Sequence, residues 1–500
     1  MRKQLKKKIE KKLKYYKVPL NSVDTEKSEI SLTKKKIAVI GGGIAGISAA
    51  SNLAEKGFSV TLFEKEHFLG GKVGSWEFES KGEKLRAEHG FHAFFRQYYN
   101  LRDYLKKIDA YKYLIPIEDY IILLQNGDQM GFKNLDETPG LNVWDLRKEG
   151  VMNWKTFVSP KSLPFIQLLK FSEQKTFKKY DHLSFEKFAK KTGMPQKMRL
   201  VFNTFARAFF SEPDKMSMGE LIKGFHFYFL SNDHGLLYDV LDDDFQYTFI
   251  DPAAKFMINH GVQIKTSTPI NELEKTDSGF TVNNEAFDYC VLCTDVKHIR
   301  PLIQNSKGLE NYSNFTKQID QLQASDRYAV YRIWTNKFEQ KDWPFFVFTD
   351  RKDCLDSVTF YHKMEKESAE WSKQNKGGIF ELHSYALPES LKEEEAIKKA
   401  LLEEFYFYFP ELKDLEIKHS YFQHRNDFPA FHTGLRKNRP EIQTEVPGLF
   451  LAGDWVKMDN PTMLMEAAYT SGSIAANMIM KEEGVQQHQL YCVPSRGILA

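Results

Sequence analysis

The hydrophobic pattern near the N-terminus predicts one β-α-β unit. Residues 37–40 form a short apolar run that ends in glycine, as a buried parallel strand does. Residues 45–56 are rich in helix-forming residues and are followed by Gly57, which favours the end of a helix there. A second apolar run covers residues 58–63 and stops at Glu64. This alternation predicts an α/β domain built on a parallel sheet.

Two distant segments have the pattern of further strands of the same domain. Residues 261–295 alternate like successive strands and end in a wholly apolar one. Residues 446–456 form another buried strand that runs into a Gly-Asp turn. A last helix is expected from about Pro461, a residue suited to the first helical position, to about Lys481.

The segments between these pieces differ in character and predict a second domain. Residues 150–245 are helical in pattern and dense in aromatic residues, whereas residues 325–385 contain strand-like runs. We therefore expect a mixed sheet with a helical cap. The predicted parts are a basic amphipathic helix and linker (1–34), a discontinuous dinucleotide-binding domain (35–110, 246–300 and 441–482), a substrate-binding domain (111–245 and 301–440) and a tail (483–500).

Composition agrees with a globular protein of more than one domain. The chain has 500 residues, of which 42% are hydrophobic and 27% charged. Four cysteines and no recognisable signal peptide lead us to expect a cytoplasmic protein. Cys290 and Cys293 form a CxxC spacing, but they lie in an apolar run, which favours small buried side chains over redox or metal use. No apolar run is long enough to predict a membrane span.

Positive charge is concentrated at the N-terminus. Residues 1–17 hold nine Lys or Arg and one Glu, a local charge of +8, so the remainder of a chain with net charge +3 carries −5. That balance argues against a nucleic-acid binder. Leu5, Ile9, Leu13 and Tyr16 recur at helical spacing, which predicts a basic amphipathic helix. Such a helix can bind an anionic membrane surface, but a solvated tail has the same composition.

The glycines after the first strand predict a dinucleotide site. Gly41, Gly43 and Gly46 satisfy GxGxxG between a strand and a helix, where unpaired N–H groups attract a pyrophosphate. Glu64 ends the second strand about twenty residues on, where a carboxylate binds ribose hydroxyls. An acidic residue there argues against the 2′-phosphate of NADP and leaves FAD and NAD.

Three further features favour FAD. Gly70, Gly71 and Lys72 provide a second glycine pair close to Glu64. Gly453 and Asp454 follow a distant strand, where the carboxylate could hold ribityl hydroxyls. The last helix could direct its N-terminus at the flavin ring. We therefore expect FAD as the cofactor and no second dinucleotide site.

These motifs resemble the flavin amine oxidase and phytoene desaturase superfamily over residues 35–482. GGKVGSW (70–76) is similar to the carotene desaturase branch, and EHGFHAFFRQYYNLR (88–102), FHFYFLSNDHGLLYD (225–239) and LMEAAYTSG (464–472) are most similar to CrtU-type carotenoid desaturases. The resemblance implies a GR2-type Rossmann FAD domain interleaved with the substrate domain, and non-covalent FAD. The implied cofactor-binding set comprises Gly41, Gly43, Ile44, Ala45, Gly46, Glu64, Gly70, Gly71, Lys72, Val262, Gly453, Asp454, Met465 and Ala467.

The resemblance also implies a function. We expect an FAD-dependent oxidoreductase that desaturates a carotenoid and aromatises its β-ring with a methyl shift. It would work at the membrane surface, with a quinone or oxygen as electron acceptor. The alternatives are a hydroxysqualene or amine oxidoreductase on the same fold, and a non-catalytic prenyl-lipid-binding escort.

The segment EHGFHAFFRQYYNLR combines titratable groups with rings. His89 and His92 form HxxH, but no third ligand is near in sequence, so no metal is expected. Phe94, Tyr98, Leu101 and Leu105 have helical spacing. His92 and Arg96 are the candidates for proton handling or acceptor contact, although Arg96 could instead pair with Glu88, and either histidine could be a structural hydrogen-bonding group.

Overall fold

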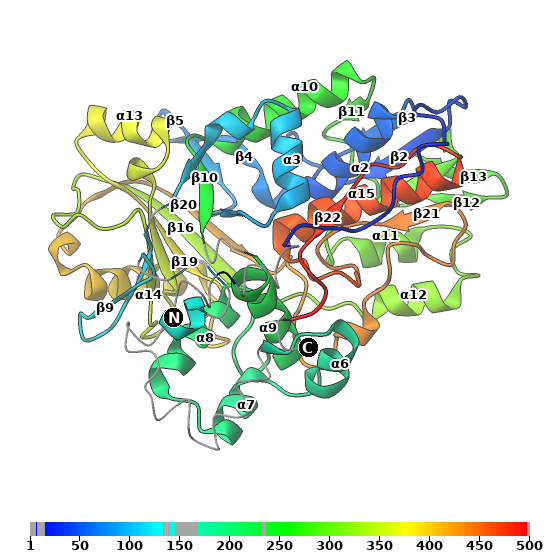
Figure 1. The fold of residues 1–500 in the computed structure, drawn as a ribbon. Helices are drawn as coiled ribbons and strands as arrows, with labels where there is room; N and C mark the ends of the chain where they lie inside the picture. Colours follow the sequence, from blue (N-terminus) through cyan, green and yellow to red (C-terminus); the bar gives the residue numbers. More distant parts are fainter. Residues whose placement is uncertain are drawn as a thin grey trace.

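A computed structural model describes residues 7, 16–117, 119–133, 136, 138, 141–145, 169–232 and 237–497. The basic helix expected in residues 1–17 therefore lies almost entirely outside the described residues. In the described part, a parallel sheet with its helices occupies one side of the molecule and a larger mixed sheet the other (Figure 1). Helices from the middle of the chain lie below them in this view.

The parallel sheet is assembled from segments far apart in the sequence. Its order is β11-β3-β2-β15-β21, and every neighbouring pair is parallel. Its strands are β2 (Lys36–Ile40), β3 (Ser59–Phe63), β11 (Gln263–Lys265), β15 (Tyr289–Leu292) and β21 (Leu449–Leu451). Helix α2 (Ile44–Glu55) connects β2 to β3 and packs against α15 (Leu464–Glu482). The β-α-β unit and the distant strands of the sequence prediction are confirmed.

Two local expectations are wrong. The last helix begins at Leu464 rather than Pro461, because Met463 before it is extended, with φ −142° and ψ 153°. Phe94 belongs to a strand, β6 (Phe94–Phe95), and helix α3 begins only at Tyr99 and ends at Lys107. Pairing of β6 with the distant β10 (Tyr238–Leu241) overrides the helical spacing of residues 94–105.

The second sheet has seven strands in the order β20-β16-β19-β18-β17-β8-β9. Only the β17–β8 pair is parallel. The strands are β8 (Ile121–Leu123), β9 (Gln129–Gly131), β16 (Tyr328–Thr335), β17 (Phe346–Thr349), β18 (Ser357–Phe360), β19 (Ile379–Ser384) and β20 (Ile417–Arg425). The strands expected within residues 325–385 are thus confirmed. Helices α13 (Lys366–Asn375) and α14 (Glu394–Tyr408) accompany this sheet.

The expected helical insertion is present in the described part of residues 150–245. It contains α6 (Glu173–Tyr180), α7 (Phe185–Thr192), α8 (Gln196–Arg207), α9 (Met218–Phe225) and a π-helical turn (His226–Leu230). Strand β10 at its end was not foreseen, and it pairs with β6 and with β7 (Leu114–Pro116). This small sheet joins the insertion to the segment EHGFHAFFRQYYNLR.

The remaining elements are short. They are β1 (Val18–Pro19), β4 (Ser75–Ser80), β5 (Glu83–Glu88), α4 (Leu141–Asp145), α10 (Asp251–Asn259), β12 (Glu274–Thr276), β13 (Gly279–Val282), β14 (Glu285–Phe287), α11 (Ile299–Asn305), α12 (Ser313–Asp320) and β22 (Tyr491–Cys492). Strand β22 pairs with β1 and anchors the C-terminal tail, and the main-chain N–H and C=O of Tyr491 both bond to the Asn100 side chain in α3.

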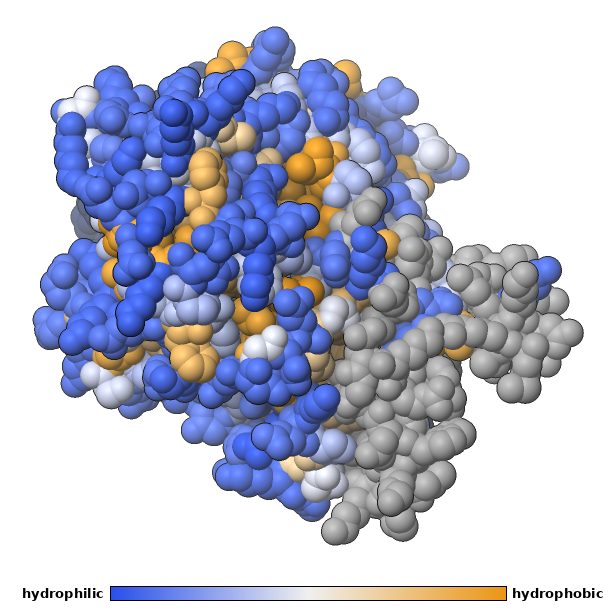
Figure 2. All heavy atoms as spheres, turned by 90° about the vertical axis from the view of Figure 1, so that its left-hand side faces the viewer, coloured by the Kyte–Doolittle hydropathy of each residue, from blue (hydrophilic) through white to orange (hydrophobic). Residues whose placement is uncertain are grey.

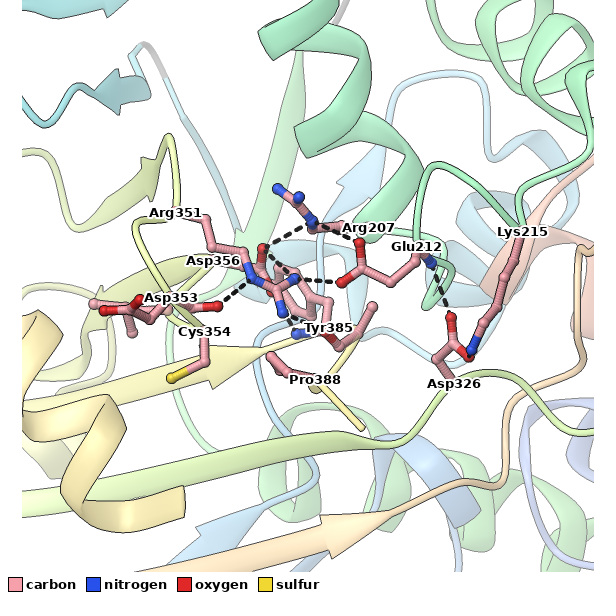
Figure 3. Close-up of polar contacts among 12 residues, drawn as sticks. Arg207, Glu212, Lys215, Asp326, Arg351, Asp353, Cys354, Asp356, Tyr385 and Pro388 are labelled. Carbon is pink, nitrogen blue, oxygen red and sulfur yellow. Dashed lines mark hydrogen bonds and ion pairs between the residues drawn. The ribbon is translucent and has the colours of Figure 1, made fainter. Parts of the chain in front are cut away.

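A partly buried ion cluster attaches the helical insertion to the mixed sheet (Figure 3). Arg351, between β17 and β18, places Nη1 3.1 Å from a Glu212 oxygen and 3.4 Å from an Asp356 oxygen. The Nε of Arg207, the last residue of α8, lies 3.5 Å and 3.9 Å from the same two carboxylates. Two arginines and two carboxylates thus balance one another where these elements meet, which limits the cost of burying them.

The face on the left of Figure 1 is mainly hydrophilic, and hydrophobic groups reach it as separate islands (Figure 2). Across the described chain, no helix is both long enough and apolar enough to cross a bilayer.

Candidate functional site

A cavity of about 1110 Å³ lies between the carboxyl ends of the parallel strands and the mixed sheet. Residues that follow β2, β3, β11 and β15 line one end of it. Residues of α8, α9, β17 and β20 line the other. Ligands of open α/β sheets bind at the carboxyl ends of the strands, so the cavity occupies the expected position.

The glycine loop leaves room for a ligand at this edge. Gly41 has φ +108°, a conformation that favours glycine. A Cβ on Gly46 would lie only 1.8 Å from the Gly41 carbonyl oxygen, whereas one on Gly43 would meet nothing closer than 3.9 Å. Gly43 caps α2 without a side-chain hydrogen bond, so the first N–H groups of the helix remain available for an anion.

Glu64 is fixed by two backbone bonds. Its Oε2 accepts the Gly42 N–H at 2.7 Å, and its Oε1 accepts the Glu66 N–H at 2.9 Å. Burial raises the pKa of Glu64 above its ordinary value, and these two N–H bonds oppose that rise. Each oxygen keeps a further lone pair for a hydroxyl, as ribose binding requires.

Two charged groups face each other across the next part of the cavity. Gly70 donates its N–H to the Gly42 carbonyl, which brings the second glycine pair beside the first loop. Lys72 then places Nζ 3.8 Å from an Asp454 oxygen and 4.2 Å from the centre of the Phe428 ring. Gly70, Gly71, Gly453 and Asp454 all line the cavity. The sequence motifs separated by almost 400 residues therefore meet here.

A buried polar atom without a partner also marks this end as a binding site. Thr294 lines the cavity directly after the β15 segment, and its Oγ1 is buried with no hydrogen-bond partner. An apolar cavity wall would not need this hydroxyl, whereas a polar cofactor could pair with it. The open Gly43 cradle, the fixed Glu64 carboxylate and this hydroxyl together fit a dinucleotide.

The structure places most of the predicted cofactor residues in the cavity wall. They are Gly41, Gly43, Ile44, Ala45, Glu64, Gly70, Gly71, Lys72, Gly453, Asp454 and Met465. Gly46, Val262 and Ala467 do not line it. Val262 is buried before β11 and donates its N–H to Met257.

Sequence reasoning missed two groups of wall residues. After β11 the cavity is lined by Thr268, Pro269 and Ile270, and after β15 by Thr294 and Asp295. Their position in the sequence could have identified them, because each group follows the carboxyl end of a strand that the hydrophobic pattern assigns to the parallel sheet.

The candidate catalytic residues occupy different environments. His92 lines the cavity, but Arg96 does not. Arg96 Nη2 donates to Asp239 at 2.6 Å, and Arg102 binds the other oxygen of the same carboxylate at 2.6 Å. The suggested Arg96–Glu88 pair is therefore wrong. Glu88 instead lies 3.6 Å from Nη2 of Arg332, because β5 turns its carboxylate toward β16.

The far end of the cavity is lined by aromatic rings, of which Phe225, Tyr228 and Phe229 belong to the segment FHFYFLSNDHGLLYD. They come from α8, α9, the π-helical turn, β17 and β20. Phe91, from the EHGFHAFFRQYYNLR segment, stacks on Phe346 with ring centres 4.2 Å apart. Phe210 stacks on Phe428 at 3.7 Å. The cavity thus joins a polar cofactor end to a long apolar chamber.

Several known proteins are similar to this chain in sequence. The family model "Flavin containing amine oxidoreductase" matches residues 44–480. A carotenoid phi-ring synthase of Streptomyces griseus is 32% identical over 92% of this chain and 90% of its own. A carotenoid phi-ring synthase of Chlorobaculum tepidum is 26% identical, covering 95% and 93%, and a zeta-carotene desaturase of Synechocystis sp. is 24% identical, covering 90% and 98%.

Solved structures share the fold at low sequence identity. An oxidoreductase from Methanosarcina mazei has a TM-score of 0.63 at 15% identity, covering 89% of this chain and 100% of its own. Putrescine oxidase bound to putrescine has a TM-score of 0.61 at 13% identity, covering 90% and 99%. These similarities confirm the expected combination of a Rossmann-type domain with a substrate domain. With the family match across residues 44–480, they place this chain among the flavin containing amine oxidoreductases, as a flavin-dependent enzyme.

Proposed function

We propose that this protein binds FAD non-covalently and oxidises a carotenoid, converting its β-ring to an aromatic ring with a methyl shift. The observation that carries the proposal is one continuous cavity that joins the dinucleotide-type end to a chamber walled by aromatic side chains. Relatives that cover nearly the whole chain are carotenoid phi-ring synthases and carotene desaturases.

The residues at the polar end support FAD in particular. The N-terminus of α2 and Gly43 would hold the pyrophosphate, and Glu64 the adenosine ribose. Asp454 would hold the ribityl hydroxyls. The cavity residues contributed by α15 are Leu464, Met465 and Ala468, and none of them is a thiol, which supports non-covalent binding.

The aromatic end supports a long apolar substrate. Removing a hydride from an allylic carbon leaves a cation that spreads over a polyene. The faces of rings such as Phe205, Phe229 and Phe346 can stabilise that charge without attacking it. Bound flavin would supply the hydride acceptor. The chain's own residues would orient the ring, exclude water and take up the released protons.

The remaining parts of the proposal concern partners. Full aromatisation removes four hydrogens in two rounds, so an electron acceptor, a quinone or oxygen, must be used between the rounds.

We place the protein at the cytoplasmic membrane surface, where apolar substrate is dissolved, through the basic segment 1–17. Deleting this segment should lower binding to anionic vesicles, and unchanged binding would contradict the membrane part alone.

The test is expression of the gene in bacteria that make β-carotene, followed by pigment analysis. We expect aromatic-ring carotenoids and a purified protein that contains releasable FAD. Unchanged β-carotene together with activity on squalene derivatives or amines would favour the other oxidoreductases of this fold. Protein that binds no flavin would favour a lipid-binding escort.

A further inference from the structure

We propose that His89 is the proton acceptor of this site and that Asp427, held by Tyr328, positions it and stabilises its protonated form. The inference rests on the proposed function and goes further, because it assigns the step that releases the ring proton to one side chain. It also replaces Arg96 as a candidate, since that side chain is outside the cavity and is already bound to Asp239.

The three side chains come together from three parts of the fold. His89 follows β5 and lines the cavity, while Tyr328 begins β16 and Asp427 follows β20. Asp427 Oδ1 accepts the Tyr328 hydroxyl at 2.8 Å, and its Oδ2 lies 3.7 Å from His89 Nε2. The second distance is longer than a hydrogen bond and is short enough for an ion pair once the imidazole is charged. Catalytic contacts of this kind often tighten only when substrate is bound.

Burial keeps His89 ready to accept a proton. The side chain is 3% exposed, and burial lowers the pKa of the imidazole below 6.5, while Asp427 opposes that effect. The histidine is therefore neutral at pH 7. Burial alone would raise the pKa of Asp427, but His89, the Lys72 ammonium and the Tyr328 hydroxyl together hold that pKa far below its ordinary value, so the carboxylate is charged. The titratable or charged groups that face this pair are Lys72, His92, Asp295, Tyr328 and Arg425.

The proton that His89 accepts comes from the substrate cation formed in the proposed reaction. After a hydride has left an allylic carbon of the ring, the ring carries a positive charge. A C–H bond next to the cationic carbon then breaks, and its electron pair becomes the new C=C bond. The proton moves to a ring nitrogen of His89, which becomes an imidazolium paired with Asp427. The substrate thereby loses one hydride and one proton, which are two hydrogens, in each of the two rounds.

His92 is the competing candidate, since it also lines the cavity. Its pKa is lowered to about 4 by burial and by the neighbouring His89. Among the described residues no carboxylate is hydrogen-bonded to it, and its ring packs edge-on against Phe245 at 5.4 Å. The carboxylate that acts on His92 is Glu381, which already binds Arg332 at 2.7 Å, whereas Asp427 lies directly beside His89.

The experiment compares His89→Gln, Asp427→Asn and His92→Gln with the wild type, and uses the exposed His260→Gln as the control. Each purified holoenzyme is given β-carotene in detergent micelles, and kcat/KM is measured from pH 5 to pH 8. Wild-type kcat/KM should rise with pH through the His89 pKa and then level off, because only the neutral imidazole accepts a proton. His89→Gln should lower the plateau by about 100-fold or more and remove this rise. Retained FAD absorbance shows that the variant is folded.

The other variants separate a catalytic role from a structural one. Asp427→Asn should move the rise to lower pH, since the carboxylate no longer favours the imidazolium, and His260→Gln should change nothing. Free imidazole should restore part of the activity of His89→Ala. If His89→Gln keeps the pH dependence, or if His92→Gln abolishes it, the assignment of His89 is overturned. A wild-type enzyme that leaves β-carotene unchanged instead overturns the proposed function, and the inference with it.

Discussion

Glu466, in the first turn of α15, should make the stability of this protein fall as pH rises. The side chain is 3% exposed. It binds the N-terminus of α3, accepting the Asn100 N–H at 2.9 Å, the Leu101 N–H at 3.1 Å and the Asn100 side-chain amide at 3.0 Å. Burial outweighs these bonds and raises the pKa of the carboxyl from 4.5 to about 8.

The magnitude follows from linkage between proton binding and folding. A group whose pKa is higher in the folded state binds its proton more tightly there. Its stabilising contribution is complete below pH 4.5 and is lost as pH rises through about 8. With about 1.36 kcal/mol for each pKa unit, a rise from 4.5 to about 8 corresponds to about 5 kcal/mol in the free energy of unfolding.

The assay is urea unfolding of the holoenzyme between pH 5 and pH 9, with the midpoint concentration as the readout. The wild-type midpoint should fall with pH, most steeply between about pH 5 and pH 7, where the folded state keeps the proton and the unfolded state has lost it. Glu466→Gln cannot ionise and should flatten this dependence, although at low pH it should cost about 1–3 kcal/mol because its amide cannot accept the Leu101 N–H. The exposed Glu403→Gln serves as the matched control. An unchanged pH slope in Glu466→Gln would refute the reasoning.

Three further substitutions test the packing around the site. Gly46→Ala should give folded protein without flavin absorbance, since its Cβ would lie 1.8 Å from the Gly41 oxygen, and normal flavin content would contradict the role of that contact. Arg351→Ala should lower the free energy of unfolding by about 3–5 kcal/mol, because the buried Asp356 carboxylate then keeps only the more distant Arg207 as an ion-pair partner, and urea midpoints would show this (Figure 3). Ser217→Ala should cost about 1–3 kcal/mol, because it removes the cap that accepts the Gly219 and Glu220 N–H groups of α9 and the hydrogen bond that its hydroxyl donates to Asp181 at 2.9 Å, and an unchanged urea midpoint would contradict both roles.

The parallel sheet was predictable because its strands are short apolar runs whose ends carry glycines and acidic residues. The period of the pattern and the GxGxxG spacing sufficed for β2, α2 and β3. The start of α15 was predicted at Pro461 instead of Leu464, because the extended conformation of Met463 depends on tertiary packing and cannot be inferred from Pro461. Phe94 was assigned to a helix for a similar reason, because its partner in the small sheet lies about 145 residues away along the chain.

The cavity was predictable at its cofactor end and much less so at its apolar end. Glycines and carboxylates at fixed spacings predict a dinucleotide site. Aromatic residues in helices have the same sequence pattern whether they fill a core or line a chamber. The Tyr328–Asp427 contact depends on the register of β16 and β20, and His89 reaches it from the end of β5, a combination that no local pattern reveals. The segment EHGFHAFFRQYYNLR predicted His92 and Arg96 as candidates and left the role of His89 open, because only the fold brings Asp427 beside it.

The interleaved order of the parallel sheet has a consequence for biosynthesis. Strand β3 ends at Phe63, but β21 begins only at Leu449, and α15, which packs on α2, follows it. At 5–20 residues per second, a ribosome needs roughly 20–80 s to make the intervening chain. During that interval the glycine loop exists without the helix that supports it, so cofactor capture must wait until translation is almost complete. Chaperones that shield β2 and β3 on the nascent chain should therefore raise the yield of flavin-loaded enzyme more than added flavin does.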